Sequence, residues 1–290
     1  MNEKSGVKID VVGDVHGHYQ ELLKLLEKLG YSRKGNIFRH SDNRCLGFVG
    51  DFINRGPDSA KVLNLVKSLH QEGLAVAVLG NHEFRLIQDS VSGKKVPSEY
   101  EPFLPWLRTL PLFIELERIR IVHAVWHFSS IERLKKTMVS DDAFIEETMK
   151  KKSPFGEAVK RIVSGMKIKI PPDLKLVDRF GIQRSKGRLK WWMDLRGKSF
   201  TESFLSPMEP EVHERGPNDE QLTMLEPYDK LEKPVFFGHY CLPPNIPKVS
   251  GQTVCLDGCV TCDKTLWAYR YEGTEIPSTL NLVEAKVNNA

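Results

Sequence analysis

Short apolar runs that end in a glycine and a polar cluster recur along the first ninety residues. VKIDVVGD ends at Asp14, CLGFVGD ends at Asp51, and LAVAVLGNHE continues past Asn81. Alternating apolar positions that merge into a continuous apolar run are typical of a buried strand. The pattern therefore predicts three buried strands, each followed by polar side chains.

Segments with helical spacing separate these three runs. YQELLKLLEKLG (19–30) and DSAKVLNLVKSLHQEG (58–73) place apolar residues on one helical face and end at glycine. Alternation of strand and helix favours parallel strands with crossover helices. Ligands in such sheets bind at the carboxyl ends of the strands, so the polar clusters should meet in one crevice.

The second half of the chain is richer in strand patterns. PLFIELERIRIVHAV (111–125) predicts a hairpin, and three later runs predict strands: KPVFFGHY (233–240), QTVCLDG (252–258) and TLWAYRYEG (265–273). Residues 129–170 are helical in composition and rich in lysine. We interpret those lysines as a solvated helix face, with an electropositive cap over the crevice as the alternative. The second set of strands predicts a second sheet packed on the first.

Composition is that of an ordinary globular chain. The 290 residues are 40% hydrophobic and 28% charged, with a net charge of +4, which is too small to predict a nucleic-acid partner. The N-terminus lacks the apolar core of a secretory signal, and no apolar run approaches the roughly 18 residues of a membrane helix. We therefore expect a cytoplasmic protein without a membrane partner; its oligomeric state stays open.

The five cysteines do not predict a disulfide framework, because their number is odd and the chain is long. Reduced thiols in a cytosol are the expectation. Cys259 and Cys262 form a C-x-x-C pair, but a structural zinc site needs four ligands and no second pair lies near. No role is assigned to that pair, and Cys255 is interpreted as a buried strand thiol.

Metal-ligand side chains directly follow five of the apolar runs. A single histidine after a strand is usually a surface or packed residue, but five such loops are hard to explain by packing. Mixed oxygen and nitrogen ligands suit divalent manganese, iron or zinc. The residues are Asp14 and His16, Asp51, Asn81 with His82, His123, and His239.

The order and spacing of these loops resemble the calcineurin-like metallophosphoesterase superfamily. The carrying motifs are GDVHG at 13–17, GDFINRG at 50–56, GNHE at 80–83, His123, and GHY at 238–240. Within the superfamily they are similar to the phosphoprotein phosphatase group, which includes bacterial Ser/Thr phosphatases and symmetrical diadenosine tetraphosphatases. The resemblance implies an α/β fold, a four-layer αββα sandwich of two mixed sheets with a dimetal site at the strand ends.

The resemblance also implies a domain organisation. A single domain would span 6–275, with a variable helical and loop insert at about 129–232. Residues 1–5 and 276–290 would be tails.

The family pattern implies two metal ions, Mn²⁺ first, with Fe or Zn as alternatives. Asp14 and His16 would hold one ion, and Asp51 would bridge both, because two close cations need negative charge between them. The second ion would be completed by Asn81, His123 and His239. Two ions clamp phosphoryl oxygens and acidify a water, so attack on phosphorus by a hydroxide held between them is expected.

Four further assignments come from the resemblance. His82 would be the general acid, and Arg55 would bind phosphate together with Asn81. A second phosphate-binding arginine is expected from the middle of the chain. Arg188, just before Trp191 and Trp192, is the first choice, with Arg184 and Arg196 as alternatives. The tryptophan pair is expected to be core rather than a base-stacking platform.

Asn54 departs from the family pattern. Phosphoprotein phosphatases have an aspartate before the arginine, and that carboxylate hydrogen-bonds the catalytic histidine. Asn54 can still orient His82 but brings no negative charge, so a more acidic His82 is expected. This substitution weighs against a protein phosphatase, but not against phosphate chemistry.

Several functions remain open from the sequence. Hydrolysis of phosphomonoesters, including phosphoserine and phosphothreonine in proteins, is the first hypothesis. Hydrolysis of dinucleoside polyphosphates such as diadenosine tetraphosphate is the alternative, because LDGCVTCDKTLWAYRY (256–271) resembles the tetraphosphatases. A phosphodiesterase and a non-catalytic phospho-binding module are less favoured, because all six ligand positions and His82 are present.

Overall fold

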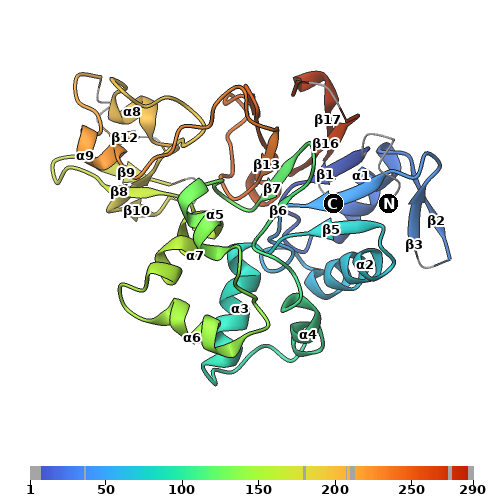
Figure 1. Cartoon of the computed structure of the whole chain (residues 1–290). Coiled ribbons are helices and arrows are strands. Elements are labelled where there is room, and N and C mark those ends of the chain that lie inside the picture. Colours follow the sequence, from blue (N-terminus) through green and yellow to red (C-terminus); the bar gives the residue numbers. More distant parts are fainter. Residues whose placement is uncertain are drawn as a thin grey trace.

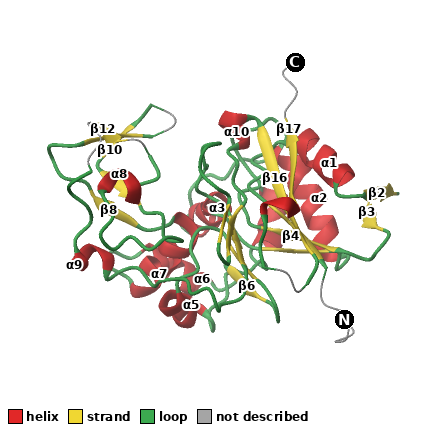
Figure 2. Cartoon of the chain, turned by 90° about the horizontal axis from the view of Figure 1, so that it is seen from above, coloured by secondary structure: helices red, strands yellow, loops and turns green. Residues whose placement is uncertain are grey.

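Two five-stranded sheets face each other in the computed structural model of the chain (Figure 1). The structure describes residues 8–35, 37–178, 181–206, 208–209, 213–273 and 276–286. Helices lie outside the two sheets (Figure 2). The predicted αββα sandwich of two mixed sheets is therefore correct.

The first sheet contains the three predicted parallel strands. β1 pairs in parallel with β4, and β4 with β5, while β16 runs antiparallel to β1 and β17 antiparallel to β16. In sheet order the strands are β17 (Leu282–Lys286), β16 (Thr265–Tyr271), β1 (Ile9–Val12), β4 (Cys45–Phe48) and β5 (Ala75–Ala77). The parallel strands point their carboxyl ends at the same edge, as the strand–helix alternation requires.

The second sheet is built from the predicted hairpin and two of the later strand patterns. β6 and β7 are the antiparallel hairpin, and β13 lies parallel to both β7 and β15. In sheet order the strands are β14 (Val249–Ser250), β15 (Thr253–Cys255), β13 (Val235–Phe237), β7 (Arg120–Val122) and β6 (Phe113–Glu115).

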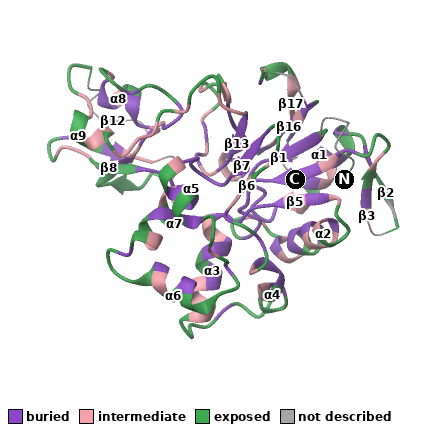
Figure 3. Ribbon diagram, in the orientation of Figure 1, coloured by how far each residue is buried: buried purple, intermediate pink, exposed green. Residues whose placement is uncertain are grey.

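An apolar layer from both sheets fills the space between them. Ile9 and Val11 of β1 meet Ile121 of β7 and Phe236 of β13 in one cluster, and all four are fully buried. Figure 3 shows this buried interior along the central strands. The alternation of side chains along each strand allows this apolar layer to form, because one face of the strand meets the other sheet and the opposite face meets helices.

Helices cover the outer faces of the sheets. α1 and α2 pack against the first sheet, while α3, α5, α6 and α7 contact one another on the side of the second. Their bounds are α1 (Tyr19–Lys28), α2 (Ser59–Gln71), α3 (Asn81–Val91), α4 (Leu104–Leu107), α5 (Phe128–Leu134), α6 (Asp142–Met149) and α7 (Pro154–Ser164), with a 3-10 turn at Glu101–Phe103.

The segment after α7 forms a lobe beside the sheets (Figure 2). It has its own apolar cluster, which includes Leu176, Leu189 and Phe204. Its elements are β8 (Lys167–Lys169), β9 (Lys175–Val177), β10 (Gln183–Arg184), β11 (Lys186–Arg188), α8 (Phe200–Ser203), β12 (Met208–Glu209) and α9 (Asp219–Leu222). The antiparallel pair of β8 and β11 carries basic side chains toward the sheets' strand ends.

Two features of the fold differ from the sequence expectations. β2 (Tyr31–Lys34) and β3 (Ile37–His40) form an unpredicted hairpin, and residues 276–286 are not a tail, because β17 pairs along β16. Pairing of this kind depends on backbone hydrogen bonds to a neighbouring strand, which a weakly alternating segment does not reveal. The predicted tail 1–5 lies outside the described residues. Two short helical turns complete the chain, α10 (Val260–Asp263) and a 3-10 turn at Thr279–Asn281.

Two tryptophans and two histidines that are not candidate ligands are buried. Trp191 and Trp192 are buried in the main core, as expected, so neither is available to stack on a nucleobase. His127 is buried, and its side chain caps α5 by accepting from the Ser130 N–H. His18 is also buried, beside Glu21.

Candidate metal centre

Strand ends from both sheets meet at a cavity of about 500 Å³. Asp14 follows β1, Asp51 follows β4, and Asn81 begins α3 after β5. From the second sheet, His239 follows β13 and lines the same cavity, while His123 follows β7 and lies close to Asp51. Residues separated by more than 200 positions are thus brought together, although their roles as ligands remain predictions.

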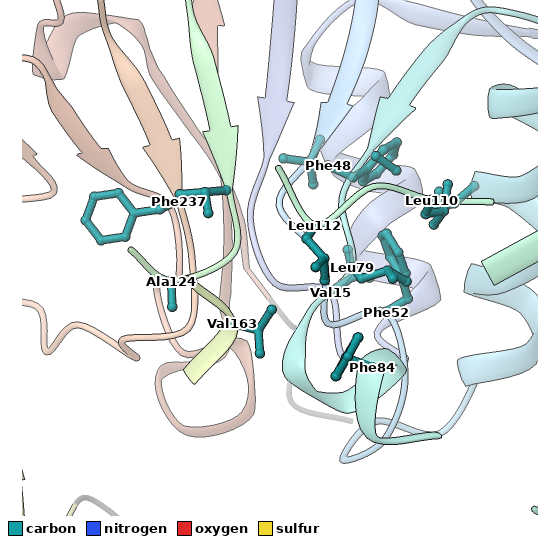
Figure 4. Close-up of a cluster of buried hydrophobic side chains, with 14 of the residues drawn as sticks. Val15, Phe48, Phe52, Leu79, Phe84, Leu110, Leu112, Ala124, Val163 and Phe237 are labelled. Carbon is teal, nitrogen blue, oxygen red and sulfur yellow. The ribbon is translucent and has the colours of Figure 1, made fainter. Parts of the chain in front are cut away.

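Apolar neighbours in the core fix each of these loops. Val15 lies between Asp14 and His16, Phe52 follows Asp51, and Leu79 nearly adjoins Asn81. All three apolar side chains are fully buried, and Figure 4 shows them in one cluster with Phe48 and Phe84. Ala124 and Phe237, which adjoin the two histidine loops of the second sheet, also appear in Figure 4. Close packing of these anchors limits how far the polar side chains beside them can move.

Asp51 lies at the middle of the candidate ligands. Its Oδ2 atom is 3.5 Å from the Nε2 of His16 and 3.4 Å from the Nε2 of His123. It belongs to two clusters whose ligand atoms lie within 4.8 Å of one another, one with His16 and His82 and the other with His123 and His239. A carboxylate shared by two clusters has the placement that a bridging ligand needs.

The donor atoms suit divalent metal ions. Asp14 Oδ1 and His239 Nε2 are buried and have no hydrogen-bond partner among the described residues. The Nδ1 atoms of His16 and His123 face the carbonyls of Ile53 and Val49 at 3.0 and 2.8 Å. Such contacts fix the ring orientation and leave Nε2 as the ligand atom. The residues present therefore fit a pair of metal ions.

The charges of the site also favour a bound cation. Burial alone would raise the pKa of Asp51, but the imidazoles of His123 and His16 outweigh burial and hold it well below its usual range. Although burial alone would lower it, the Asp51 carboxylate raises the pKa of His123 to about 10. Burial raises the pKa of Asp14, and the negative charge of Asp257 raises it further. The carboxylates of this buried site thus bind positive charge strongly.

Glycines allow the loops to approach the carboxylates. A Cβ atom on Gly80 would lie 2.1 Å from the Oδ1 of Asp51, and one on Gly238 would lie 1.8 Å from the Oδ1 of Asp14. No other residue fits at these two positions without displacing a candidate ligand.

Glu83 holds the Asp51 loop in place, and the sequence interpretation assigned it no role. Its buried carboxylate accepts hydrogen bonds from the backbone N–H groups of Asp51, Phe52 and Gly80 at 2.9, 2.8 and 3.0 Å. Its place in the GNHE motif was the available signal. Glu83 therefore positions the loop and does not face the cavity.

His82, Asn54 and Arg55 lie at one side of Asp51. The Nδ2 of Asn54 is 2.7 Å from the Nδ1 of His82, and the Nε2 of His82 is 4.0 Å from the Oδ2 of Asp51. Burial lowers the pKa of His82 to about 4. Arg55 lines the cavity and has a left-handed backbone conformation (φ 72°). The geometry suits the predicted acid and phosphate clamp.

The three mid-chain arginines differ in their position relative to the cavity. Arg188 and Arg184 line the cavity, whereas Arg196 is exposed and pairs with Asp194 at 2.8 Å. Arg188 donates to the backbone carbonyl of His239 at 3.2 Å, and its Nε has no hydrogen-bond partner among the described residues. The placement favours Arg188 and Arg184 over Arg196 as phosphate contacts.

Asp257 is a cavity residue that the sequence interpretation missed. It follows β15 in the sequence LDG, so the strand-end rule that selected Asp14 and Asp51 would have found it. Its carboxylate accepts from the N–H groups of Cys241 and Cys259 at 2.6 and 2.8 Å. Asp257 therefore joins the segment after His239 to the turn before α10.

The expectation that all five cysteines are reduced is wrong for two of them. Cys241 and Cys259 form a disulfide across 18 residues. Linear spacing did not reveal this pair, because the two residues meet only where β13 and β15 end side by side. Cys255 is buried in its strand, as expected.

A cavity with clustered carboxylates, imidazoles and arginines at the strand ends of an αββα sandwich defines a metal-dependent phosphoesterase type of site. The chain belongs to the calcineurin-like phosphoesterase family, whose sequence profile matches residues 7–242.

Curated relatives carry a more specific name. A bis(5'-nucleosyl)-tetraphosphatase PrpE [asymmetrical] from Oceanobacillus iheyensis is 38% identical over 138 residues, which cover 41% of this chain and 55% of the relative. The protein of the same name from Halalkalibacterium halodurans is 39% identical over 118 residues, covering 40% and 46%. The chain thus spans about half the length of the curated relatives it matches.

A solved structure supports the fold. A protein serine/threonine phosphatase from Saccharomyces cerevisiae matches all of this chain and 82% of its own, with a TM-score of 0.50 and 16% identity. At that identity the match bears on architecture alone. In the described part of the chain, no helix has the length and apolar character to cross a membrane.

Proposed function

We propose that this chain is a dinuclear metal phosphohydrolase that cleaves phosphoanhydrides in dinucleoside polyphosphates. The observation that carries the proposal is the distribution of charge around the cavity. Carboxylates and imidazoles from the sheets line one side, and basic residues of the insert line the other. The basic residues are Lys167, Arg184, Lys186 and Arg188, and Arg55 from the loop after β4 also lines the cavity.

A single phosphate does not need so many cations. Arg55 and Arg188 together provide enough N–H donors for one phosphoryl group. Lys167, Lys186 and Arg184 add positive charge to the same cavity, and among the described residues Arg184 pairs with the cavity carboxylate of Asp178. Several cations around one cavity complement a chain of several phosphates. The names of the curated relatives support the same substrate class.

The proposed roles follow from position. Asp14, His16 and Asp51 would hold one ion, and Asp51, Asn81, His123 and His239 the other; Mn²⁺ is the first choice. When bound, the ions polarise the phosphoryl oxygens and acidify a water molecule.

The chain's own residues would do the rest. Arg55 and Arg188 orient the phosphoryl group and stabilise the charge that develops on its oxygens. His82 gives the proton from Nε2 to the leaving oxygen.

Hydrolysis of phosphomonoesters is the second candidate. Arg55 lies beside Asp51 and His82, where a terminal phosphoryl group would fit without using the insert. Phosphoserine and phosphothreonine in proteins belong to this class.

A side-by-side assay tests the proposal. With Mn²⁺ present, kcat/KM would be measured for diadenosine tetraphosphate, p-nitrophenyl phosphate and a phosphothreonine peptide. We expect the dinucleotide to be favoured by at least about tenfold, and we expect Lys186→Ala to lower that preference selectively. Equal or higher kcat/KM for the peptide, unaffected by Lys186→Ala, would reject the dinucleotide and support the monoesterase. If the metal-loaded protein turned over none of the three substrates, both hydrolase functions would be rejected. A non-catalytic phospho-binding module would then be the remaining function.

A further inference from the structure

Three of the five cysteines meet beside the candidate metal centre. Cys241 and Cys259 form the disulfide, and Cys262 completes a group whose three sulfur atoms lie within 4.8 Å of one another. Cys241 comes two residues after His239 and lines the same cavity. The other two cysteines, Cys45 and Cys255, lie in strands β4 and β15. The cluster is therefore a distinct thiol site that adjoins the cavity.

The disulfide links two segments that also carry cavity residues. One segment contains His239 and Cys241, and the other contains Asp257 and Cys259. The backbone N–H of His239 donates to the Oδ2 of Asp14 at 3.0 Å, so displacement of the first segment would move both side chains. The S–S bond is the only covalent link between these segments apart from the chain that connects them.

Cys262 is placed to exchange with this disulfide. It lies one helical turn after Cys259, and its N–H donates to the Cys259 carbonyl at 2.9 Å. Cys259 is buried, whereas Cys241 and Cys262 are both partly exposed. Cys259 is therefore a central sulfur with an accessible cysteine on each side.

We propose that Cys241, Cys259 and Cys262 form a thiol–disulfide exchange site. The exchange makes and breaks the covalent cross-link to the segment that carries His239. In the exchange step, the Cys262 thiolate attacks the Sγ of Cys259. A Cys259–Cys262 bond forms as the Cys241–Cys259 bond breaks, and the electron pair leaves on the Cys241 sulfur, which takes up the proton that Cys262 gave up. No net oxidation occurs, so the step needs no other reactant.

A hydroperoxide would oxidise two of the cysteines to a disulfide, and a dithiol would reduce that disulfide. A thiolate attacks the peroxide, whose O–O bond breaks to give a sulfenic acid, and the second thiol displaces water as the S–S bond forms. Two cysteines lose two electrons, and hydrogen peroxide becomes two waters. A dithiol reverses the change by two exchange steps and becomes the oxidised disulfide.

The position of the disulfide determines how firmly the segment that carries His239 is held. With the bond between Cys241 and Cys259, the two segments are cross-linked. With the bond between Cys259 and Cys262, they are joined by hydrogen bonds to Asp257, from the N–H groups of Cys241 and Leu242. Loss of outer support for a ligand typically weakens metal binding 10- to 100-fold, so we expect at least about tenfold weaker Mn²⁺ binding. The exchange itself does not depend on the proposed hydrolase activity.

Disulfide mapping tests the exchange in the full chain. The protein is equilibrated over a series of oxidised to reduced dithiothreitol ratios, quenched with acid and alkylated, and its peptides are mapped by mass spectrometry. We expect both disulfides in the wild type, Cys259–Cys262 alone in Cys241→Ser, and Cys241–Cys259 alone in Cys262→Ser. Cys45→Ser is the matched control and should reproduce the wild-type pattern.

Calorimetric titration with Mn²⁺ then tests the coupling. Cys241→Ser should bind about tenfold more weakly than Cys45→Ser, and Cys262→Ser should bind like the control under oxidising conditions. The wild-type map alone decides the chemistry if a variant fails to fold. A wild type without the Cys259–Cys262 bond at any ratio would overturn the proposal. So would a copurified zinc ion that Cys262→Ser removes, since the cluster would then be a metal site.

Discussion

The side-chain amide of Asn54 donates toward the imidazole of His82, with 2.7 Å between Nδ2 and Nδ1. The Tyr100 hydroxyl donates to the Oδ1 of the same amide at 3.4 Å, which keeps the Nδ2 group turned toward the histidine. A donor at Nδ1 leaves the proton of neutral His82 on Nε2, the nitrogen nearer to Asp51. Asn54 thus selects the form of His82 that has its proton on the cavity side.

Replacing Asn54 by aspartate should move the pH profile of the reaction. Burial holds the pKa of His82 at about 4, and a carboxylate at position 54 would favour the imidazolium and raise that pKa. A general acid loses activity as the pH rises through its pKa, so the falling limb of kcat should move upward by about one unit. A pH–rate series on Asn54→Asp and the wild type measures this, and an unmoved limb would contradict the assignment of His82. Asn54→Ala controls for loss of the contact: it should lower kcat without that upward displacement.

Removing the charge of Asp51 should remove the bound metal. Asp51 is the carboxylate shared by both ligand clusters, so Asp51→Asn should reduce the metal content per chain and lower kcat at least about a thousandfold. Elemental analysis by mass spectrometry and a steady-state assay check the two effects. Asp89→Asn, which alters only surface pairs with Arg85 and Lys94, should keep both at wild-type values. Full activity in Asp51→Asn would refute the proposed centre.

Arg188 and Arg196 provide a matched comparison of phosphate binding. Arg188 lines the cavity, and Arg196 pairs with Asp194 outside it. We expect Arg188→Ala to lower kcat/KM about 10- to 100-fold and Arg196→Ala to change it less than twofold. Arg188→Lys should recover part of the loss, because lysine keeps the charge without the planar fork. Similar kcat/KM values for the two alanine variants would exclude Arg188 as a phosphate contact.

Glu83→Gln should destabilise the fold without touching the cavity. The Glu83 carboxylate accepts four backbone N–H groups at two oxygens, and an amide replaces one of those oxygens by a donor. Two buried N–H groups would lose their acceptor, at a cost of about 2–4 kcal/mol in the free energy of unfolding. Urea denaturation of metal-free protein measures this, with Glu101→Gln on an exposed turn as the control. A loss below about 0.5 kcal/mol would show that the loop is held in another way.

The repeated strand–loop pattern was sufficient to predict the three parallel strands of the first sheet and the polar residues at their carboxyl ends. Each loop places a polar residue next to a strand that must be buried, and parallel strands bring such loops to one edge. Asp14, Asp51 and Asn81 were found in this way. Asp257 obeys the same rule, because it follows β15 in the sequence LDG.

Other features depend on tertiary contacts. β17 is a strand because β16, the strand before it in the chain, offers it an edge, and the ring of buried His127 donates to the carbonyl of Met224. Neither partner can be inferred from the local sequence. Glu83 belongs to a recognisable motif, but the four N–H groups it holds are defined only by how two loops cross.

The sequence by itself determined the three parallel strands with their crossover helices, the family, and the residue types available for metal and phosphate. Local periodicity and motif spacing carry that information, because they show which face of each helix or strand is buried and where each strand ends in a loop. The tertiary structure alone decided that Arg188 lies at the cavity and Arg196 does not, and that Cys241 meets Cys259 with Cys262 beside them. These are distances between segments far apart in the chain, and packing of the sheets and the insert sets them.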